Sequence, residues 1–276
     1  MSKTTFVGDI HVKSEILNRV EKIFNEDKNI DKLVFLGDYV DDWNTSAKDN
    51  VAILEEIFNL KKKYNDKIVL LLGNHEMSYM GFPCSGHKPS KETEKLLHDN
   101  LDLLDVVYKT NDFIVTHGGF TELWLNMLKD QYLIEDDDKV IDKINEMFHK
   151  RDGSIMRDLN LASLSSGGYS IISSCLWARP TDHTYSPINL GKDQIIGHTP
   201  NRQELKNSVG SIIIDGLEIN DKIFYIDTFS TWRDSGEPIG KEEILIFDDN
   251  TKSYYSKSLV TDREEFIYQR SSYEKM

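Results

Sequence analysis

Five short apolar runs in this chain each end beside a glycine and a residue that can bind a metal ion. The first three runs lead into Asp9, Asp38 and Asn74, and two later runs lead into His117 and His198. In open α/β sheets, ligands bind outside the carboxyl ends of the strands, so side chains far apart in sequence meet there. The neighbouring glycines permit tight turns and close backbone approach. The pattern therefore predicts an α/β fold with one functional site at the strand ends.

The first half of the chain alternates β-branched runs with helical patterns, as in sheets whose strands are joined by crossover helices. The segment 121–161 is predominantly helical, with an acidic break at 135–138, and is the best candidate for a cap or insertion over the site. From about residue 194 the chain is rich in strands, which predicts a second sheet. We expect strands at 4–7, 32–36, 68–72, 113–116, 194–196, 211–214, 222–226 and 243–247, and helices from about residue 14, through 51–58 and around 92–104.

Composition limits the classes of function. The chain has 276 residues, which fits the single domain 1–276 that we expect. Acidic residues outnumber basic ones 47 to 33, and the net charge of −14 argues against a stable complex with nucleic acid. No apolar run approaches the ~20 residues of a membrane span and no apolar signal region follows Met1, so we expect a cytoplasmic protein without membrane attachment. Cys84 and Cys175 lack zinc spacing and are expected to be reduced thiols.

The candidate ligands are two aspartates, one asparagine and three histidines, His11 included. This mixture of oxygen and imidazole donors suits divalent manganese, iron or zinc and is unlike a soft thiolate site. We expect two manganese ions, with iron, zinc or nickel as alternatives. Two such ions about 3.5–4 Å apart hold the attacking and leaving oxygens of an in-line phosphoryl displacement, and they lower the pKa of bound water toward 7, which supplies a hydroxide nucleophile. His75 is placed to protonate the leaving alkoxide, and Asp41 is placed to orient the imidazole and raise its pKa.

The motifs stand in a particular order along the chain: Gly8-Asp9-Ile10-His11, Gly37-Asp38-Tyr39-Val40-Asp41, Gly73-Asn74-His75-Glu76, Thr116-His117-Gly118-Gly119 and Gly197-His198-Thr199-Pro200. In this order they resemble the calcineurin-like metallophosphoesterase superfamily, and specifically its serine/threonine phosphoprotein phosphatase branch. The symmetrical diadenosine tetraphosphatases share the last motif and are also similar. The resemblance spans residues 8–200 and is weaker beyond them.

The resemblance implies a four-layer α/β/β/α sandwich with the site above two central sheets. It also implies that Asp38 bridges two metal ions, that His75 is the general acid and that Asp41 supports His75. The other ligands that it implies are Asp9 and His11 on one ion, and Asn74, His117 and His198 on the other.

A further element of the family, Leu-Trp-x-Arg-Pro, stands at 176–180 and contains Arg179. A planar guanidinium matches two phosphate oxygens at once, so the resemblance implies that Arg179 binds the substrate phosphate. The alternative for Arg179 is an ion pair on the surface.

Three positions depart from the family pattern. Asp42 stands where the family has the arginine that binds the substrate phosphate, so affinity for simple phosphomonoesters is reduced unless another cation substitutes. Val12 replaces the usual glycine, and 227–229 lacks the glycine that often follows Asp-Thr. Both of these changes concern loop geometry, not metal binding. The candidate substitutes for the missing arginine are Arg151, Arg157 and Arg202.

Three functions compete. The leading hypothesis is a metal-dependent phosphatase acting on phosphoserine or phosphothreonine in proteins. The second is a hydrolase of dinucleoside polyphosphates or other nucleotides, and the sequence does not separate these two. The third, a catalytically silent binding scaffold, rests only on the missing arginine at position 42, since no candidate ligand is lost. The oligomeric state and the role of residues 251–276 have no readable signal.

Among the remaining histidines, His183 is close to Arg179 and is a candidate for the mouth of the site. The other histidines fall away from strand ends, and the tryptophans lack the basic stripe that a base-stacking platform needs. We therefore expect His87, His98 and His149 to be solvated, and expect Trp124, Trp177 and Trp232 in the core or the cleft wall.

Overall fold

The computed structural model describes residues 2–43, 45–82 and 90–270, so Cys84 and His87 lie outside the described residues. No helix within these ranges is long and apolar enough to cross a membrane, and Cys175 is buried and free. The strands are β1 (Lys3–Val7), β2 (Ile30–Phe35), β3 (Ile68–Leu71), β4 (Leu104–Asp105), β5 (Tyr108–Lys109), β6 (Phe113–Val115), β7 (Asp193–Ile196), β8 (Val209–Ile214), β9 (Leu217–Tyr225), β10 (Glu243–Asp248), β11 (Ser253–Ser258) and β12 (Glu264–Gln269). The α-helices are α1 (Ser14–Glu26), α2 (Ala47–Tyr64), α3 (Asn74–Ser78), α4 (Lys91–Asp99), α5 (Glu122–Tyr132), α6 (Asp137–His149), α7 (Gly153–Leu159) and α8 (Pro180–Tyr185).

The first sheet has seven strands in the order β12-β11-β10-β1-β2-β3-β4. Its central strands β1, β2 and β3 are parallel, and their side chains alternate between two apolar clusters. In β2, for example, Val34 packs in the cluster shared with the second sheet, whereas Leu33 and Phe35 pack in the cluster shared with α1 and α2. Both faces of the sheet are therefore buried, which is why these strands are uninterrupted apolar runs in the sequence.

The second sheet has five strands in the order β5-β6-β7-β9-β8. The expectation that strands after residue 194 form this sheet is right for β7, β8 and β9 but wrong for β10, which pairs antiparallel with β1. β11 and β12 continue the first sheet from β10, so part of the segment 251–276 is sheet. The reason is the open edge of β1, whose unpaired backbone groups need a partner strand.

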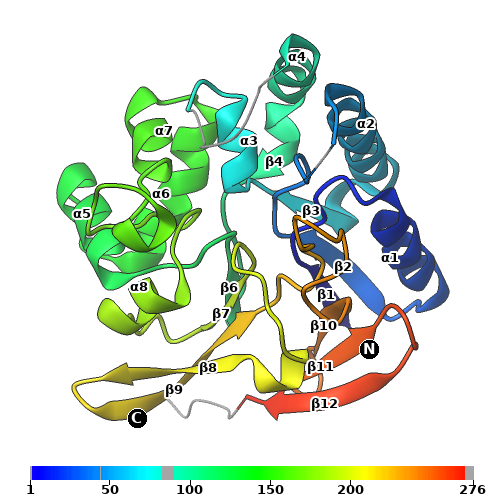
Figure 1. Ribbon diagram of the computed structural model, residues 1–276. Helices are drawn as coiled ribbons and strands as arrows, with labels where there is room; N and C mark the ends of the chain where they lie inside the picture. The colour runs from blue at the N-terminus through cyan, green and yellow to red at the C-terminus, as the bar shows by residue number, and fades with distance from the viewer. Residues whose placement is uncertain (1, 44, 83–89, 271–276) are drawn as a thin grey trace.

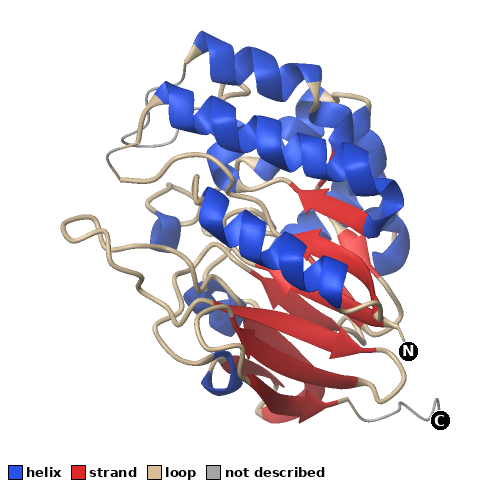
Figure 2. Ribbon diagram, turned by 90° about the vertical axis from the view of Figure 1, so that its right-hand side faces the viewer, coloured by secondary structure: helices blue, strands red, loops and turns tan. Residues whose placement is uncertain are grey.

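The two sheets pack face to face. The ring of Phe113 in the second sheet lies 5.0 Å from that of Phe6 and 5.3 Å from that of Phe247, both in the first sheet. Helices α1 and α2 lie on one outer side and α5 to α8 lie on the other (Figure 1), and Figure 2 shows helices crossing in front of the strands. The four-layer α/β/β/α arrangement implied by the resemblance is confirmed.

The helices expected from residue 14 and through 51–58 are α1 and α2, which bury one apolar face each. The helix expected around 92–104 is shorter than predicted, because α4 ends at Asp99. Leu104 instead pairs with Leu70 of β3, so burial at the sheet edge outweighs the helical pattern there.

The stretch 121–161 contains α5, α6 and α7, whose apolar faces join the same cluster as α1 and α2. The acidic break predicted at 135–138 contains the N-terminus of α6. There the side chain of Asp136 accepts a hydrogen bond from the backbone N–H of Lys139 and caps the helix. The role of this stretch as a cap over the site stays a prediction.

Arg270, directly after β12, joins the C-terminal strand to the second sheet. Its guanidinium lies 2.9 Å from Asp193 and 3.3 Å from Asp221, and both acidic side chains are fully buried. Burial raises the pKa of Asp193 to about 6, against the opposing effect of Arg270.

We expect Arg270→Met to lower the free energy of unfolding by about 3–5 kcal/mol at pH 7, because it leaves buried carboxylates without their cation. Without Arg270 the pKa of Asp193 rises further above its value in the unfolded chain, so stability falls as pH rises and the loss shrinks toward pH 5. Urea unfolding at pH 5 and pH 7 measures both effects. Arg157→Met, at an exposed position, is the control; an equal loss at both pH values would contradict the role of Asp193.

Candidate metal centre

The polar residues that follow the parallel strands gather at one edge of the two sheets. Asp9 follows β1, Asp38 follows β2 and Asn74 follows β3 in the first sheet, while His117 follows β6 and His198 follows β7 in the second. All five side chains are buried. They converge because the strands within each group are parallel, so that their carboxyl ends lie along a common edge.

The side-chain oxygen of Asn74 is the meeting point of one set of candidate ligands. It lies 2.8 Å from Nε2 of His117 and 2.8 Å from Nδ1 of His198. A carboxylate oxygen of Asp38 lies 3.2 Å from the same Nε2 of His117. Asp38, His117 and His198 each offer a ligand atom within 4.8 Å of the others. The structure thus brings together the four residues expected on the second ion.

The ring of His117 tests whether this set fits a cation. Its Nδ1 lies 2.8 Å from the carbonyl oxygen of Leu36, so Nδ1 carries a proton and donates it. In a neutral ring Nε2 then directs a lone pair at the oxygens of Asn74 and Asp38, which is repulsive unless a cation lies among them. Burial lowers the pKa of His117, but nearby carboxylates, Asp38 foremost, outweigh burial and raise it to about 10. The site therefore needs positive charge here, and a divalent cation that displaces the proton fits it.

The ring of His198 meets the same set with its Nδ1, which lies against the side-chain oxygen of Asn74, so Nδ1 is its candidate ligand atom. The other ring nitrogen, Nε2, is buried and has no hydrogen-bond partner among the described residues.

The other set of candidate ligands surrounds His11 and Asp38. Nδ1 of His11 lies 2.7 Å from the backbone oxygen of Asp41, which leaves Nε2 for a metal ion. His11 and Asp38 offer ligand atoms within 4.8 Å of each other and of His75. The carboxylate of Asp9 accepts a hydrogen bond of 3.0 Å from the backbone N–H of His198. Asp38 therefore contributes to both sets, as a bridging ligand must.

Two glycines leave room for these carboxylates. A Cβ atom at Gly197 would lie 2.1 Å from a carboxylate oxygen of Asp9, and one at Gly73 would lie 2.2 Å from a carboxylate oxygen of Asp38. Any side chain at these positions would displace a candidate ligand. The Gly-His and Gly-Asn pairs of the motifs are thus required by packing around the ligands.

Glu76 was not predicted as a site residue. Its fully buried carboxylate accepts hydrogen bonds of 2.9 Å from the backbone N–H groups of Gly73, Asp38 and Tyr39. It joins the loop after β2 to the loop after β3 and so holds Asp38 beside Asn74. Burial and the charge of Asp38 raise the pKa of Glu76 to about 7. The signal in the sequence is its place as the third residue of α3, where an acid caps the first turn.

His75 and Asp41 are paired as predicted. Nδ1 of His75 lies 3.3 Å from Asp41, and Nε2 lies 3.9 Å from Asp38. Burial lowers the pKa of His75, but Asp38 and Asp41 outweigh burial and raise it to about 9. The other oxygen of Asp41 accepts hydrogen bonds of 2.6 Å from Tyr79 and 2.8 Å from Asn50. These two orienting residues were missed, because both lie on helical segments and not at strand ends.

Asp227 was treated only as part of a loop, yet it belongs to the site. It follows β9, which runs parallel to β7, and burial raises its pKa to about 6. Burial also raises the pKa of Asp9 well above its usual range, and the charge of Asp227 adds to this effect. The missing glycine does not open the loop, because the hydroxyl of Thr228 donates to the backbone oxygen of Glu243 at 2.6 Å. The strand-end signal that finds the other residues also identifies Asp227.

Arg179 lies at the N-terminus of α8, directly before Pro180. Its Nε donates to Ser166 at 3.2 Å. Burial lowers the pKa of its guanidinium, opposed first by Asp182 and then by Asp227, Asp38 and Asp9. Burial and His117 lower the pKa of His198, and the charge of Arg179 adds to this effect. Across residues 2–43, 45–82 and 90–270 no carboxylate forms an ion pair with its guanidinium, which disfavours the alternative of a surface ion pair.

Val12, the departure from glycine, has a φ of +57°. A β-branched residue rarely adopts this left-handed region. The loop nevertheless keeps its position, because the N–H of Val12 donates to the backbone oxygen of Tyr39 at 2.8 Å and that of His11 donates to Asp38 at 3.0 Å. The valine therefore strains the loop without displacing His11.

The other singled-out residues are placed as follows. His183 does not line the mouth of the site, because its side chain is 5% exposed and forms a 2.9 Å hydrogen bond with the backbone oxygen of Gly118, next to His117.

Two candidate substitutes for the missing arginine are engaged elsewhere: Arg151 forms an ion pair with Asp102, and Arg157 donates a hydrogen bond to Ser154. His98 and His149 are exposed and Trp124 is in the core, as expected, while Trp177 packs on His198 with ring centroids 5.7 Å apart.

Comparison with known proteins agrees with this geometry. The family described as Calcineurin-like phosphoesterase matches residues 2–209, more than half of the chain. A putative serine/threonine-protein phosphatase from Caenorhabditis elegans is 40% identical over 70 residues, which are 25% of this chain and only 18% of that relative. A solved cold-active protein tyrosine phosphatase has a TM-score of 0.62 at 16% identity, covering 98% of this chain and 80% of its own. A solved cold-active protein-tyrosine phosphatase of a psychrophilic Shewanella species has a TM-score of 0.59 at 16% identity. The match covers 97% of this chain and 81% of the Shewanella chain. These two likenesses show the fold alone.

We expect Val12→Gly to raise the free energy of unfolding by about 1 kcal/mol, because relief of the strained φ exceeds the entropic cost of glycine. The content of bound metal should not change. Thermal unfolding and metal analysis measure the two quantities. Val20→Gly, inside α1 and buried, is the matched control and should destabilise the protein; a loss of stability in Val12→Gly would show that the loop is not strained.

Proposed function

Because this chain belongs to the calcineurin-like phosphoesterase family, we propose that it is a metal-dependent phosphatase that hydrolyses phosphoserine and phosphothreonine in proteins. The observation that carries the proposal is the convergence of Asp38, Asn74, His117 and His198 with their ligand atoms aimed at a common point. The lone pair that Nε2 of a neutral His117 directs at the oxygens of Asn74 and Asp38 supports a cation at that point.

The residues of this chain divide into two ligand sets that share Asp38. Two divalent cations, proposed to be manganese, would polarise the phosphoryl oxygens and lower the pKa of the attacking water. Glu76 holds the two loops that carry Asp38 and Asn74 at a fixed separation. A rigid arrangement of this kind is what in-line displacement requires, since small misplacements of the reacting atoms cost large factors in rate.

His75 is proposed as the general acid. The carboxylate of Asp41 favours the protonated imidazole, whose Nε2 can donate a proton to the leaving alkoxide. Asp41 accepts from Nδ1 and is itself fixed by Tyr79 and Asn50, which sets the plane of the ring. The side chain of His75 is 34% exposed, so a substrate can reach it from solvent.

Arg179 is proposed to bind two phosphate oxygens with its planar guanidinium. Its hydrogen bond to Ser166 leaves other N–H groups available, because a guanidinium has five donors. A polypeptide substrate is supported by the name of the C. elegans relative, a putative serine/threonine-protein phosphatase. Every candidate ligand and the general acid are present, which favours an enzyme over a silent scaffold.

The substrate class is tested by manganese-dependent phosphate release from a phosphothreonine peptide and, in parallel, from diadenosine tetraphosphate. We expect the peptide to be hydrolysed, and His75→Ala to release phosphate about 10²–10⁴-fold more slowly. Hydrolysis of the dinucleotide alone would contradict the proposal and assign the chain to nucleotide hydrolysis. If neither substrate is hydrolysed, the result would support the third hypothesis, a binding scaffold without catalytic activity.

Metal content separates the roles of Asp38 and His75. We expect Asp38→Asn to lose both metal ions, because one carboxylate serves both sets of ligands, whereas His75→Ala should keep them. Metal analysis of the purified variants after gel filtration measures this. Equal metal loss in both variants would refute the assigned roles.

A further inference from the structure

Two tryptophans on the loops of the metal centre are exposed. Trp43 is 52% exposed and lies two residues after Asp41, and Trp232 is 44% exposed and lies five residues after Asp227. Large aromatic side chains in such positions are costly to leave in water and are enriched where proteins bind partners. Of the two places expected for Trp232, the core and the cleft wall, the core is wrong, because the loop after β9 carries this side chain outward.

Each tryptophan lies beneath an arginine. The guanidinium of Arg233 lies 5.2 Å from the ring centre of Trp43, and that of Arg202 lies 4.8 Å from the ring centre of Trp232. Both arginines are exposed, and neither forms an ion pair with a carboxylate in the part of the chain that the structure describes. The basic companions that the sequence pattern lacked are thus supplied by other segments. Arg202, the third candidate substitute for the missing arginine, is engaged by the ring of Trp232.

Asp42 anchors this arrangement. Its carboxylate forms an ion pair of 2.7 Å with Lys13, both side chains being 14% exposed, and accepts a hydrogen bond of 3.0 Å from the hydroxyl of Thr231. The indole N–H of Trp43 donates to the backbone oxygen of Thr231 at 3.1 Å. The loop after β2 is therefore joined to the hairpin 231–238, which carries Trp232 and is closed by an antiparallel bridge between Thr231 and Pro238. The acid at position 42 thus has a positioning role.

The hairpin is rigid in its own right. The backbone N–H of Trp232 donates to the oxygen of Glu237 at 2.9 Å, and that of Ile239 donates to Ser230 at 2.7 Å. Arg233 is thus held over Trp43 by a defined backbone. Order of this kind lowers the entropy lost on binding a ligand.

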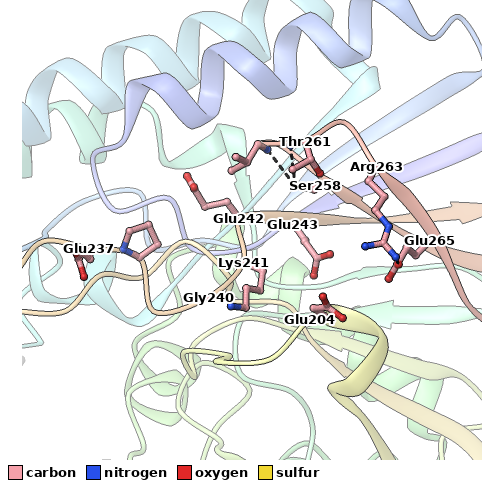
Figure 3. A pocket seen from close by; sticks show the side chains of 12 residues that line it. Glu204, Glu237, Gly240, Lys241, Glu242, Glu243, Ser258, Thr261, Arg263 and Glu265 are labelled. Carbon is pink, nitrogen blue, oxygen red and sulfur yellow. Dashed lines mark hydrogen bonds and ion pairs between the residues drawn. The ribbon is translucent and has the colours of Figure 1, made fainter.

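The two exposed arginines lie next to a cavity with mostly acidic walls. A cavity of about 600 Å³ beside the same hairpin is lined by Glu204, Glu237, Glu242, Glu243 and Glu265 with only Lys241 and Arg263 as cations, and Figure 3 shows the acidic side chains around it. None of the candidate ligands lines that cavity. In a chain of net charge −14, Arg202 and Arg233 are two exposed cations on loops that follow the candidate ligands.

We propose that Trp43, Arg233, Trp232 and Arg202, here called the Trp/Arg platform, bind an acidic polypeptide segment next to the phosphorylated residue of the substrate. The inference rests on the proposed function and names the recognition that accompanies it. Exposed guanidinium groups pair with carboxylates of the segment, and the tryptophan faces contact its apolar atoms. An open, fixed platform suits an extended chain that runs across the surface.

The test compares three substrates with wild-type protein and manganese: a phosphothreonine peptide with glutamates on both sides, the same peptide with alanines there, and 4-nitrophenyl phosphate, which has no flanking chain. We expect the acidic peptide to have a KM about tenfold lower than the alanine peptide. The double variant Arg202→Gln/Arg233→Gln should abolish this preference through KM alone, leaving 4-nitrophenyl phosphate unchanged. The preference should also weaken as salt is added.

Arg157→Gln, at an exposed position on α7, is the matched control and should keep the preference. The platform is refuted if the wild type hydrolyses both peptides with the same KM, or if the double variant retains the preference. Hydrolysis of 4-nitrophenyl phosphate without release from either peptide would instead refute the proposed function, and the platform with it.

Discussion

Four carboxylates buried in one small volume, those of Asp9, Asp38, Glu76 and Asp227, set the constraint on which the rest of this structure depends. Removing charges from water is costly unless each one is paired. Backbone N–H groups pair Glu76, a serine pairs Asp227, and histidines face Asp38, yet the net charge still calls for cations. The loops that carry these acids are consequently held together by the same interactions that make a metal site, and fold and function cannot be separated here.

The sheets supply the geometry that this charge cluster needs. Parallel pairing of β1 with β2 and of β6 with β7 aligns carboxyl ends, and the apolar cluster between the sheets sets the distance between the two rows of ligands. Backbone strain marks the same edge, because His11, Asp38, Asp41 and His198 all have positive φ. Strained residues persist only where the surrounding structure over-determines them, and the packed strands behind each loop provide that restraint.

Much of this could be read from the sequence because it is local. An apolar run, a glycine and a ligand stand together within about ten residues, so the central strands and all six candidate ligands were predicted. The pairing of β10 with β1 joins residues far apart in the chain, and no local pattern encodes it. Glu76 and Asn50 were missed for a related reason: their function lies in hydrogen bonds to other loops, which only the folded chain reveals. The sequence predicts metal ligands at strand ends better than it predicts the residues whose hydrogen bonds position those ligands.

Asp42 shows how a departure from a family pattern changes meaning once its contacts are known. Considered by itself, an acid in place of an arginine implies a lower affinity for the substrate phosphate. In the structure its carboxylate instead binds Lys13 and Thr231, and the hairpin fixed in this way carries Arg233 to the ring of Trp43. An arginine at position 42 would place two cations together and leave Thr231 without its acceptor. The exposed cations near this loop are then Arg233 and Arg202, which in the proposed platform contact the parts of a substrate beyond the phosphate.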